Sequence, residues 1–403
     1  MIGSIFESAL SFVLLIAVNR MAGETMGGVF TLAFSHAQLM YYIGTLEVRP
    51  IQSTDVRKKV PFSSYFSLRV LSCALMIAAC LAYAFLMDGD PLKKQVVFLV
   101  CLYKTTEAML DTFTAMYQQN DRIEYSGKCS VALVSLAMTA FIGTLAVTGR
   151  LEWACIALAA AGMLTLLTYN RQVWKRFPEA KIRLEFGNAG KILASCLPLF
   201  ICVFVMLYIS NAPKYAINRY CTDVIQNRYS ILFMPAFAIN LLSQFVLRPM
   251  LTSMAQLWNS GETDRFRGNL LRMSGGILGV TLLGIAGAWL LGIPVLRILY
   301  GVDLTAERSV LVWVMVYGGL NAVNVFLYDM IAVTRRQKWM LIGYAAAALM
   351  IFLLAPVMVQ RGGMTGAILS SILSIALLDV ILAGILYTVV RNQLQKKWSA
   401  PAE

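Results

Sequence analysis

The sequence is poor in charged residues. Of its 403 residues, only 14% are Asp, Glu, Lys or Arg, while 59% are hydrophobic and the mean hydropathy is +0.70. A soluble protein carries about 25% charged residues. Apolar runs recur along the whole chain, each close to the roughly 20 residues that cross a bilayer core. The composition therefore excludes an ordinary soluble protein and predicts an all-α polytopic membrane protein.

Histidine and metal-binding patterns are also scarce. His36 is the single histidine, and none of the eight cysteines stands in a CxxC pair. We interpret the cysteines as small packing residues, not as a disulfide frame or a zinc site. His36 is interpreted as a packed, hydrogen-bonded residue rather than a proton relay. GxSxG, HExxH, Walker and Rossmann patterns are absent. We therefore expect no enzyme, no cofactor and no metal.

Twelve segments are predicted to span the membrane. They are Ile2–Val18, Val29–Leu46, Tyr65–Met87, Gln95–Tyr117, Cys129–Val147, Glu152–Tyr169, Ile192–Asn211, Arg228–Leu247, Arg272–Leu291, Glu307–Met330, Trp339–Val359 and Gly366–Val390. The longest polar interruption is the basic stretch 171–191. It is expected to link an N-terminal six-helix bundle, 1–170, to a C-terminal one, 192–390, with a tail at 391–403. The two bundles are expected to be related by a pseudo-two-fold axis.

Basic residues gather in alternate loops, for example at Arg57, Lys58 and Lys59. Lys and Arg are retained on the cytoplasmic side of membranes, so both termini and the linker are predicted to be cytoplasmic. The same rule accounts for the net charge of +13 without a nucleic acid partner. Met1 stands almost at the start of the first span, so the leader is expected to be short and uncleaved.

One stretch occurs twice, 199 residues apart. AVNR from Ala17 matches AINR from Ala216, and the pair Arg49-Pro50 matches Arg248-Pro249. Between these ends, Glu24, Phe30, Phe34 and Ala37 correspond to Asp223, Tyr229, Phe233 and Ala236. The match favours two equivalent halves in parallel orientation, a common construction of transporters. Chance resemblance between two membrane segments is the alternative.

Four charges fall inside predicted spans near one another. Lys104, Glu107 and Asp111 recur at steps of three and four residues, which places them on one helical face. Arg69 in the preceding span is a candidate neighbour, and the four charges sum to zero. The set is either a structural network or a polar wall along a path through the membrane. Two isolated acids, Glu7 and Asp379, are candidates for ion or proton coupling.

Two further cations close the seventh span. Lys214 and Arg219 follow Pro213, which has no N–H and is expected to bend or end the helix. Cations beside a helix break suit an anionic phosphate. Snorkelling at the membrane interface is the alternative. Polar faces at Asn240 and Gln244, and at Asn321 and Asn324, either contact hydroxyl-rich cargo or hold helices together.

Two stretches resemble a known family. GETMGGVFTLAF from Gly23 runs into EVRPIQSTDVRKKVPFSSYFSLRV from Glu47, and SNAPKYAINRY begins at Ser210. They resemble bacterial polysaccharide-biosynthesis flippases of the Wzx type, within the multidrug/oligosaccharidyl-lipid/polysaccharide exporter superfamily. The matching positions are Gly27, Arg49, Gln52, Asp55, Tyr65, Arg69 and Lys214, the last replacing the family's usual Arg. A Lys keeps the charge but lacks the bidentate fork of an Arg.

The resemblance implies a V-shaped pair of bundles around a cationic cavity, with alternating access. The implied cargo is an undecaprenyl-diphosphate-linked oligosaccharide, moved from the cytoplasmic to the outer leaflet of the bacterial inner membrane. Membrane lipids, the polysaccharide polymerase and the chain-length machinery are the implied partners. The cations assigned to the cavity are Arg69, Lys104, Lys214 and Arg219, of which Lys104 rests on its position in a span. The polar lining assigned to it is Glu107, Asp111, Asn240, Gln244 and Asn321.

Other functions stay open from the sequence. The runner-up is a cation-coupled antiporter for small molecules or drugs, from the same superfamily. In such an antiporter the acids matter and the cations do not. A membrane-embedded polymerase or acyltransferase is disfavoured by the short loops and the single histidine. A non-transporting membrane scaffold is the remaining alternative.

Overall fold

The protein is helical throughout its described part. The computed structural model describes residues 2–55, 58–87, 90–120, 122–177, 183–334 and 339–399, and no strand occurs among them. Within these ranges, the side chains of residues 2–9 and 240–249 are among those left undescribed. The chain forms two compact units, Met1–Leu207 and Tyr208–Glu403, which we call the N-terminal and C-terminal units.

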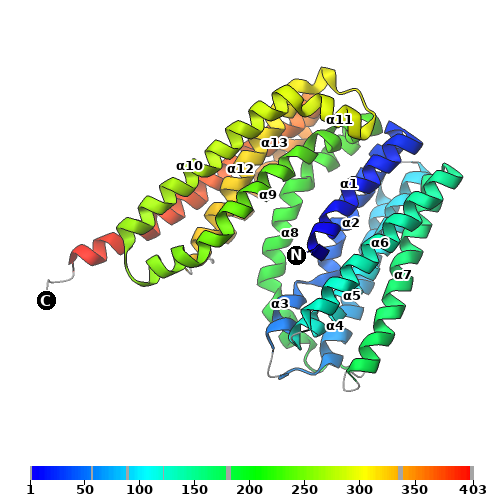
Figure 1. The fold of residues 1–403 in the computed structure, drawn as a ribbon, viewed down its shortest axis with the longest axis horizontal. Coiled ribbons are helices and arrows are strands. Elements are labelled where there is room, and N and C mark those ends of the chain that lie inside the picture. Colours follow the sequence, from blue (N-terminus) through cyan, green and yellow to red (C-terminus); the bar gives the residue numbers. More distant parts are fainter. Residues whose placement is uncertain are drawn as a thin grey trace. The chain divides into compact units, whose positions relative to one another are not determined.

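The N-terminal unit contains six long helices and one short one (Figure 1). They are α1 (Ile2–Ala22), α2 (Glu24–Thr45), the short α3 (Val48–Thr54), α4 (Phe62–Leu86), α5 (Pro91–Gln119), α6 (Ile123–Thr148) and α7 (Leu151–Arg176). Helix α5 packs against α2, α4 and α7, and is the central helix of the unit. It is also the helix that carries Lys104, Glu107 and Asp111, so these charges lie inside a packed bundle.

The C-terminal unit begins within α8 (Ala189–Tyr220). Its further elements are α9 (Asp223–Asn259), α10 (Thr263–Gly287), the π-helix η1 (Ala288–Gly292), α11 (Ile293–Tyr300), the 3-10 turn η2 (Thr305–Glu307), α12 (Arg308–Val333) and α13 (Met340–Ser399). Helix α12 packs against α9, α10 and α13, and is the counterpart of α5 at the centre of its unit.

Helix α13 is two membrane-spanning helices joined at Gly363. The φ of 53° and ψ of −130° at this residue are not helical, and glycine adopts a positive φ without a Cβ clash. Beyond the turn the chain runs back along itself. Gly343 in the first arm lies against Leu378 and Leu382 in the second. The eleventh and twelfth predicted spans therefore form an antiparallel hairpin.

The predicted fold class is confirmed by these helices. Seven helical stretches of the described chain are long and apolar enough to cross a membrane by length and composition alone. Helices α1, α2, α5 and α9 reach 21, 22, 29 and 37 residues, which also suffices to span a bilayer. With α13 counted as two, the described residues form an all-α polytopic protein with six long helices in each half of the chain.

Most of the predicted linker, 171–177 and 183–191, lies within the described residues. Helix α7 extends to Arg176, and α8 begins at Ala189. Between them, Ser63 of α4 donates to the Glu185 carboxylate at 2.6 Å, and the Glu185 amide donates to Ser67 Oγ at 2.6 Å. Residues 178–182 of the linker lie outside the described residues. The compact units divide after Leu207, within α8, whereas the predicted domain bounds place the division in the linker.

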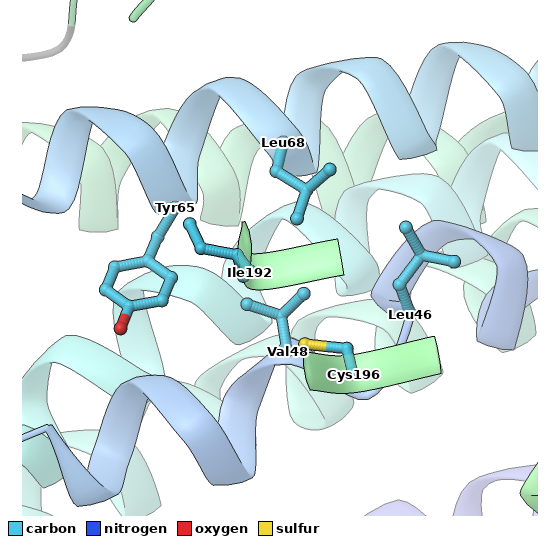
Figure 2. Close-up of a cluster of buried hydrophobic side chains, with 6 residues drawn as sticks. All are labelled: Leu46, Val48, Tyr65, Leu68, Ile192 and Cys196. Atoms are coloured by element: carbon cyan, nitrogen blue, oxygen red, sulfur yellow. The ribbon is translucent and has the colours of Figure 1, made fainter. Parts of the chain in front are cut away.

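A small apolar cluster explains why the start of α8 belongs to the N-terminal unit (Figure 2). Ile192 and Cys196 of α8 are buried against Tyr65 and Leu68 of α4. Leu46 and Val48, on either side of the α2–α3 junction, complete the cluster. Removal from water of a Leu, Ile or Val side chain in such a cluster contributes about 1.5–3 kcal/mol. The first turns of α8 are therefore held to α4 and to the α2–α3 junction.

Two local predictions are wrong, the first in part. Helix α8 was expected to bend or end at Pro213, and it does not end there but continues to Tyr220. A proline removes a single helical hydrogen bond, and packing compensates for that loss in membrane helices. Cys80 and Cys101 were interpreted as packing residues but form a disulfide between α4 and α5. Their spacing of 21 residues carried no signal, because only the antiparallel packing of two separate helices brings them together.

Candidate functional site

The first feature of the candidate site is the end of α2. Leu46 and Glu47 both adopt left-handed backbone conformations, with φ of 47° and 52°. Such conformations cost a non-glycine residue about 1–2 kcal/mol each. They turn the chain from α2 into α3 and place Arg49 beside α5. Burial and the nearby Asp111 raise the pKa of Glu47, while Arg69 and Arg49 lower it to a smaller extent.

Arg69 is the centre of a buried network at this junction. Its side chain is fully buried, and each guanidinium nitrogen has a partner. Nη2 contacts the Asp111 carboxylate at 2.8 Å, Nε donates to Thr112 Oγ1 at 2.7 Å, and Nη1 donates to the Gly44 carbonyl at 2.8 Å. Ser72 also donates to that carbonyl, at 2.6 Å. The geometry favours the structural network over the polar wall for Arg69 and Asp111.

Arg49 and Gln52 extend this network from α3. Arg49 lies 3.2 Å from the second oxygen of Asp111, and its Nε donates to Gln118 at 3.3 Å. Gln52 donates to the Thr112 carbonyl at 3.1 Å. Asp111 therefore accepts from two arginines, one fully buried and one partly exposed. Of the positions matched through the resemblance, Arg49, Gln52 and Arg69 meet here, in contact with α5.

Lys104 forms a separate site one to two turns earlier on α5. Its ammonium lies 2.8 Å from the Glu107 carboxylate and over three rings, those of Phe34, Tyr41 and Tyr103, at 5.0, 5.4 and 5.9 Å from their centroids. We call these five residues the Lys104 cluster. Lys104 is almost fully buried, but Glu107, Phe34 and Tyr41 are each partly exposed. The rings stabilise the cation while its carboxylate partner stays accessible.

The C-terminal unit places a second lysine over the equivalent ring. Lys214 of α8 lies 5.9 Å from the centroid of Phe233, which corresponds to Phe34 in the repeat. Phe30 and Phe34 stand 5.8 Å apart with rings inclined at 41°, and Tyr229 and Phe233 stand 5.6 Å apart at the same angle. Helices α2 and α9 also begin at Glu24 and Asp223, 199 residues apart. The repeated stretch therefore has a repeated local structure.

Arg219 occupies a different environment from Lys214. It is exposed in the last turn of α8 and lies 5.6 Å from the Tyr220 ring. Its repeat partner Arg20 is likewise exposed in the last turn of α1. Cations at helix C-termini complement the helix dipole, and an Arg beside a Tyr is typical of membrane interfaces. This geometry favours interface snorkelling for Arg219.

A buried acid lies in the C-terminal unit. Asn324 of α12 donates to one carboxylate oxygen of Asp379 at 3.1 Å and accepts from the Tyr344 hydroxyl at 3.3 Å. The second oxygen, Oδ2, is buried without a hydrogen-bond partner among the described residues. An ionisable group at membrane depth with an open acceptor is typical of an ion or proton pathway. The sequence indicated Asp379 and Asn324 separately, and packing joins them.

The remaining predicted residues are not joined to these clusters by any described contact. Asn321 is partly exposed on α12, one turn before Asn324. The side chains of Glu7, Asn240 and Gln244 lie outside the described residues. Sequence reasoning missed Phe34 and Tyr41, although their spacing of seven residues places them on one face of α2. His36 stacks on Tyr83 at 3.6 Å between ring centroids, which agrees with a packed residue.

Solved structures share the fold of this chain at low sequence identity. A multidrug-resistance MATE family transporter of the MOP superfamily, in an inward-facing conformation, is 12% identical with a TM-score of 0.70, and the match covers 99% of this chain and 96% of that one. The lipid II flippase MurJ, inward closed, is 13% identical with a TM-score of 0.70, over 97% and 90%. The Vibrio cholerae MATE transporter VcmN, in its bent form, is 11% identical with a TM-score of 0.59, over 97% and 94%.

No protein-family model and no curated protein matches the sequence. The shared fold covers nearly the whole chain, so the two-unit helical architecture is that of these transporters and flippases. Identities of 11 to 13% with these structures show a shared fold but do not identify the cargo.

Proposed function

We propose that this protein is a flippase that moves an undecaprenyl-diphosphate-linked oligosaccharide from the cytoplasmic to the outer leaflet of a bacterial inner membrane. The fold it shares with a lipid II flippase is compatible with a lipid-linked cargo, which the resemblance in sequence motifs implies. Both termini are cytoplasmic in this proposal, as the distribution of Lys and Arg predicts. The polymerase and the chain-length machinery of polysaccharide synthesis are its proposed partners.

The observation that carries the proposal is the Lys104 cluster. A buried ammonium is held over three rings and paired with the carboxylate of Glu107, which is one-fifth exposed. In the proposed mechanism, a phosphate oxygen of the cargo takes the place of that carboxylate oxygen. The exchange keeps Lys104 paired at every stage, and the released Glu107 carboxylate, already one-fifth exposed, is taken up by water in the cavity.

Arg69 has a supporting role in this mechanism. Its three nitrogens are already bonded to Asp111, Thr112 and Gly44. Binding phosphate would require breaking this network, at a cost of several kcal/mol for a buried charge. We therefore assign cargo binding in the N-terminal unit to Lys104 and the positioning of α2, α4 and α5 to Arg69.

The test is complementation of a strain that lacks its glycan flippase. Wild type and Lys128→Gln are expected to restore surface glycan, and Lys104→Gln is expected to reduce it at least about tenfold, the loss of one charge-assisted contact. Lys128 is the matched control because it also lies over a ring, Tyr125 at 5.2 Å, but is exposed. Equal glycan export by well-expressed Lys104→Gln and wild type would refute the assignment.

A second candidate function is a cation-coupled antiporter for small molecules, favoured by the open oxygen of Asp379. In that case Asp379→Asn abolishes transport, because the amide cannot exchange a proton, whereas Lys104→Gln leaves it intact. Drug efflux that depends on a proton or sodium gradient, measured in vesicles for both variants, separates the two functions. Glycan export that requires Asp379 and Lys104 together indicates a coupled flippase.

A further inference from the structure

A groove lies between α5 and α7, at the end of the bundle that holds the α4–α5 and α6–α7 connections. Its volume is about 350 Å³, near the lower end of the range of about 300–1,000 Å³ for small-molecule pockets. It is lined by Gln95, Phe98, Leu99, Arg150, Glu152, Trp153 and Ile156. None of these residues belongs to the networks around Arg69 or Lys104.

The groove has an apolar part and a charged part. Phe98, Leu99 and Ile156 provide the apolar wall, and Trp153 is half-exposed beside them. Arg150 and Glu152 stand at the start of α7, next to the α6–α7 connection. A tryptophan at this position is typical of the membrane–water interface, where one end of a ligand is apolar and the other is wet. The change from the charged start of α7 to the apolar wall matches a single lipid molecule, with its head group at the start of α7 and its chain along α5.

The charged part offers one acceptor and one donor. Arg150 Nε and Nη2 both contact the same oxygen of Glu152, Oε1, at 2.7 and 2.6 Å. The other oxygen, Oε2, and the Arg150 Nη1 group have no hydrogen-bond partner among the described residues. The site therefore presents a free carboxylate oxygen beside free guanidinium N–H groups, with no net charge. A zwitterion with a phosphate and a primary ammonium is complementary to this arrangement.

We propose that this groove binds a phosphoethanolamine lipid. The phosphate accepts from Arg150 Nη1, the ammonium donates to Glu152 Oε2, and an acyl chain lies along Phe98, Leu99 and Ile156. A phosphoglycerol head would supply a phosphate without an ammonium, so Glu152 would repel it. A phosphocholine head has no N–H to donate to Glu152, so it would lose a charge-assisted hydrogen bond. The proposal is independent of the cargo.

The test uses the full-length, delipidated protein and three lipids with identical acyl chains: phosphoethanolamine, phosphocholine and phosphoglycerol. Native mass spectrometry measures the affinity of each. The phosphoethanolamine lipid is expected to bind about tenfold more tightly than the other two, as one charge-assisted hydrogen bond provides. Glu152→Gln is expected to remove this preference. Equal retention of all three lipids by wild type, or an unchanged preference in Glu152→Gln, would overturn the proposal.

A matched control is available on α6. Arg122 and Glu124 have the same spacing as Arg150 and Glu152, are both exposed at 3.7 Å from each other, and do not line the groove. Glu124→Gln is expected to retain the wild-type preference. Ile156→Trp fills the apolar part at a half-exposed position where folding tolerates a larger side chain, and is expected to abolish binding. Binding that survives Ile156→Trp would place the lipid elsewhere and refute this groove.

Discussion

The two copies of the repeated stretch, 17–50 and 216–249, begin alike and end differently. Each opens with an acid in the first turn of a helix, followed by a pair of inclined rings with a lysine above the second. The first copy then breaks at Leu46 and Glu47 into the short helix α3. The second continues as one helix, α9, to Asn259. The two copies therefore share a local packing motif but differ in how the helix ends.

The lysines also reach their rings from different helices. Lys104 comes from α5, the fourth long helix of its half, and Lys214 comes from α8, the first helix of the second repeat. The residue 199 positions before Lys214 is Leu15, which carries no charge. The ring position is therefore shared by the two copies, but the cation above it comes from a different helix in each half.

The largest effect is expected from disrupting the Arg69–Asp111 network, which holds the junction between α2 and α3 in the first copy. Asp111→Asn leaves Arg69 buried without a full charge partner, and loss of one member of a buried pair costs about 3–5 kcal/mol. Unfolding of the purified protein in mixed micelles measures the loss. Glu124→Gln, in the exposed pair with Arg122, is the control and is expected to change stability by less than about 1 kcal/mol. Similar losses in both variants would contradict the role of the network.

A smaller loss is expected when the first copy is made like the second at residue 44. The residue 199 positions after Gly44 is Ser243. A Cβ on Gly44 would lie 2.7 Å from Met76 Sδ and 3.2 Å from Ala108 Cβ, so Gly44→Ser is expected to destabilise the fold by about 1–3 kcal/mol. Gly143→Ser on α6, which meets no atom within 4 Å, is the control in the same unfolding assay. If Gly44→Ser is as stable as this control, α2 and α5 do not pack as closely as described.

Two double-mutant cycles test whether the lysine–phenylalanine contacts in the two copies are equivalent. Phe34→Leu combined with Lys104→Gln, and Phe233→Leu combined with Lys214→Gln, are each expected to give a coupling of about 0.5–2 kcal/mol, the range of a partly buried cation–π contact. The same unfolding assay provides the measurement. A coupling in one half and none in the other would show that the lysines are equivalent only in position.

The smallest effect is expected at Glu47, where the two copies part. Burial raises the pKa of this acid, so folding favours its protonated form and the wild type loses stability as the pH rises through that pKa. Glu47→Gln is therefore expected to be more stable than wild type at neutral pH, and the difference disappears below about pH 4.3, the ordinary value of a Glu. The free energies of unfolding of wild type and Glu47→Gln, measured at pH 7 and pH 4, give this difference. A variant that is less stable at neutral pH would show that the Glu47 charge is favourable in the fold.

Much of the architecture could be predicted because the length of the hydrophobic runs is a property of the sequence itself. The twelve spans follow from runs of apolar residues, and the repeat pairs Glu24 with Asp223, the residues at which α2 and α9 begin. The contacts of the candidate site could be predicted only in part. Periodicity placed Lys104 and Glu107 on one face, and their ion pair follows from that. That Phe34 and Tyr41 lie under the ammonium depends on how α2 packs against α5, which no spacing in the sequence records.

Two predictions failed for related reasons. Pro213 is a local signal for a helix end, and the disulfide of Cys80 and Cys101 has no local signal at all. Both outcomes depend on neighbouring helices, which compensate for a missing hydrogen bond in one case and align two thiols in the other. Arg69 depends on packing in the same way: the sequence left open a structural network or a cavity cation, and partners from α2 and α5 surround its guanidinium.

The bond from Arg69 to the Gly44 carbonyl has a consequence for how the protein is assembled in the membrane. The last carbonyls of α2 carry the negative end of its dipole, and Arg69 on α4 acts as a C-cap supplied by another helix. Arg69 in turn needs the carboxylate of Asp111 on α5. Neither the Arg69 nor the Asp111 charge is stable alone in lipid. The cap on α2 therefore depends on α4, and the burial of Arg69 on α4 depends on α5. We therefore expect these three helices to enter the native bundle as one cooperative step, although the chain is synthesised one span at a time.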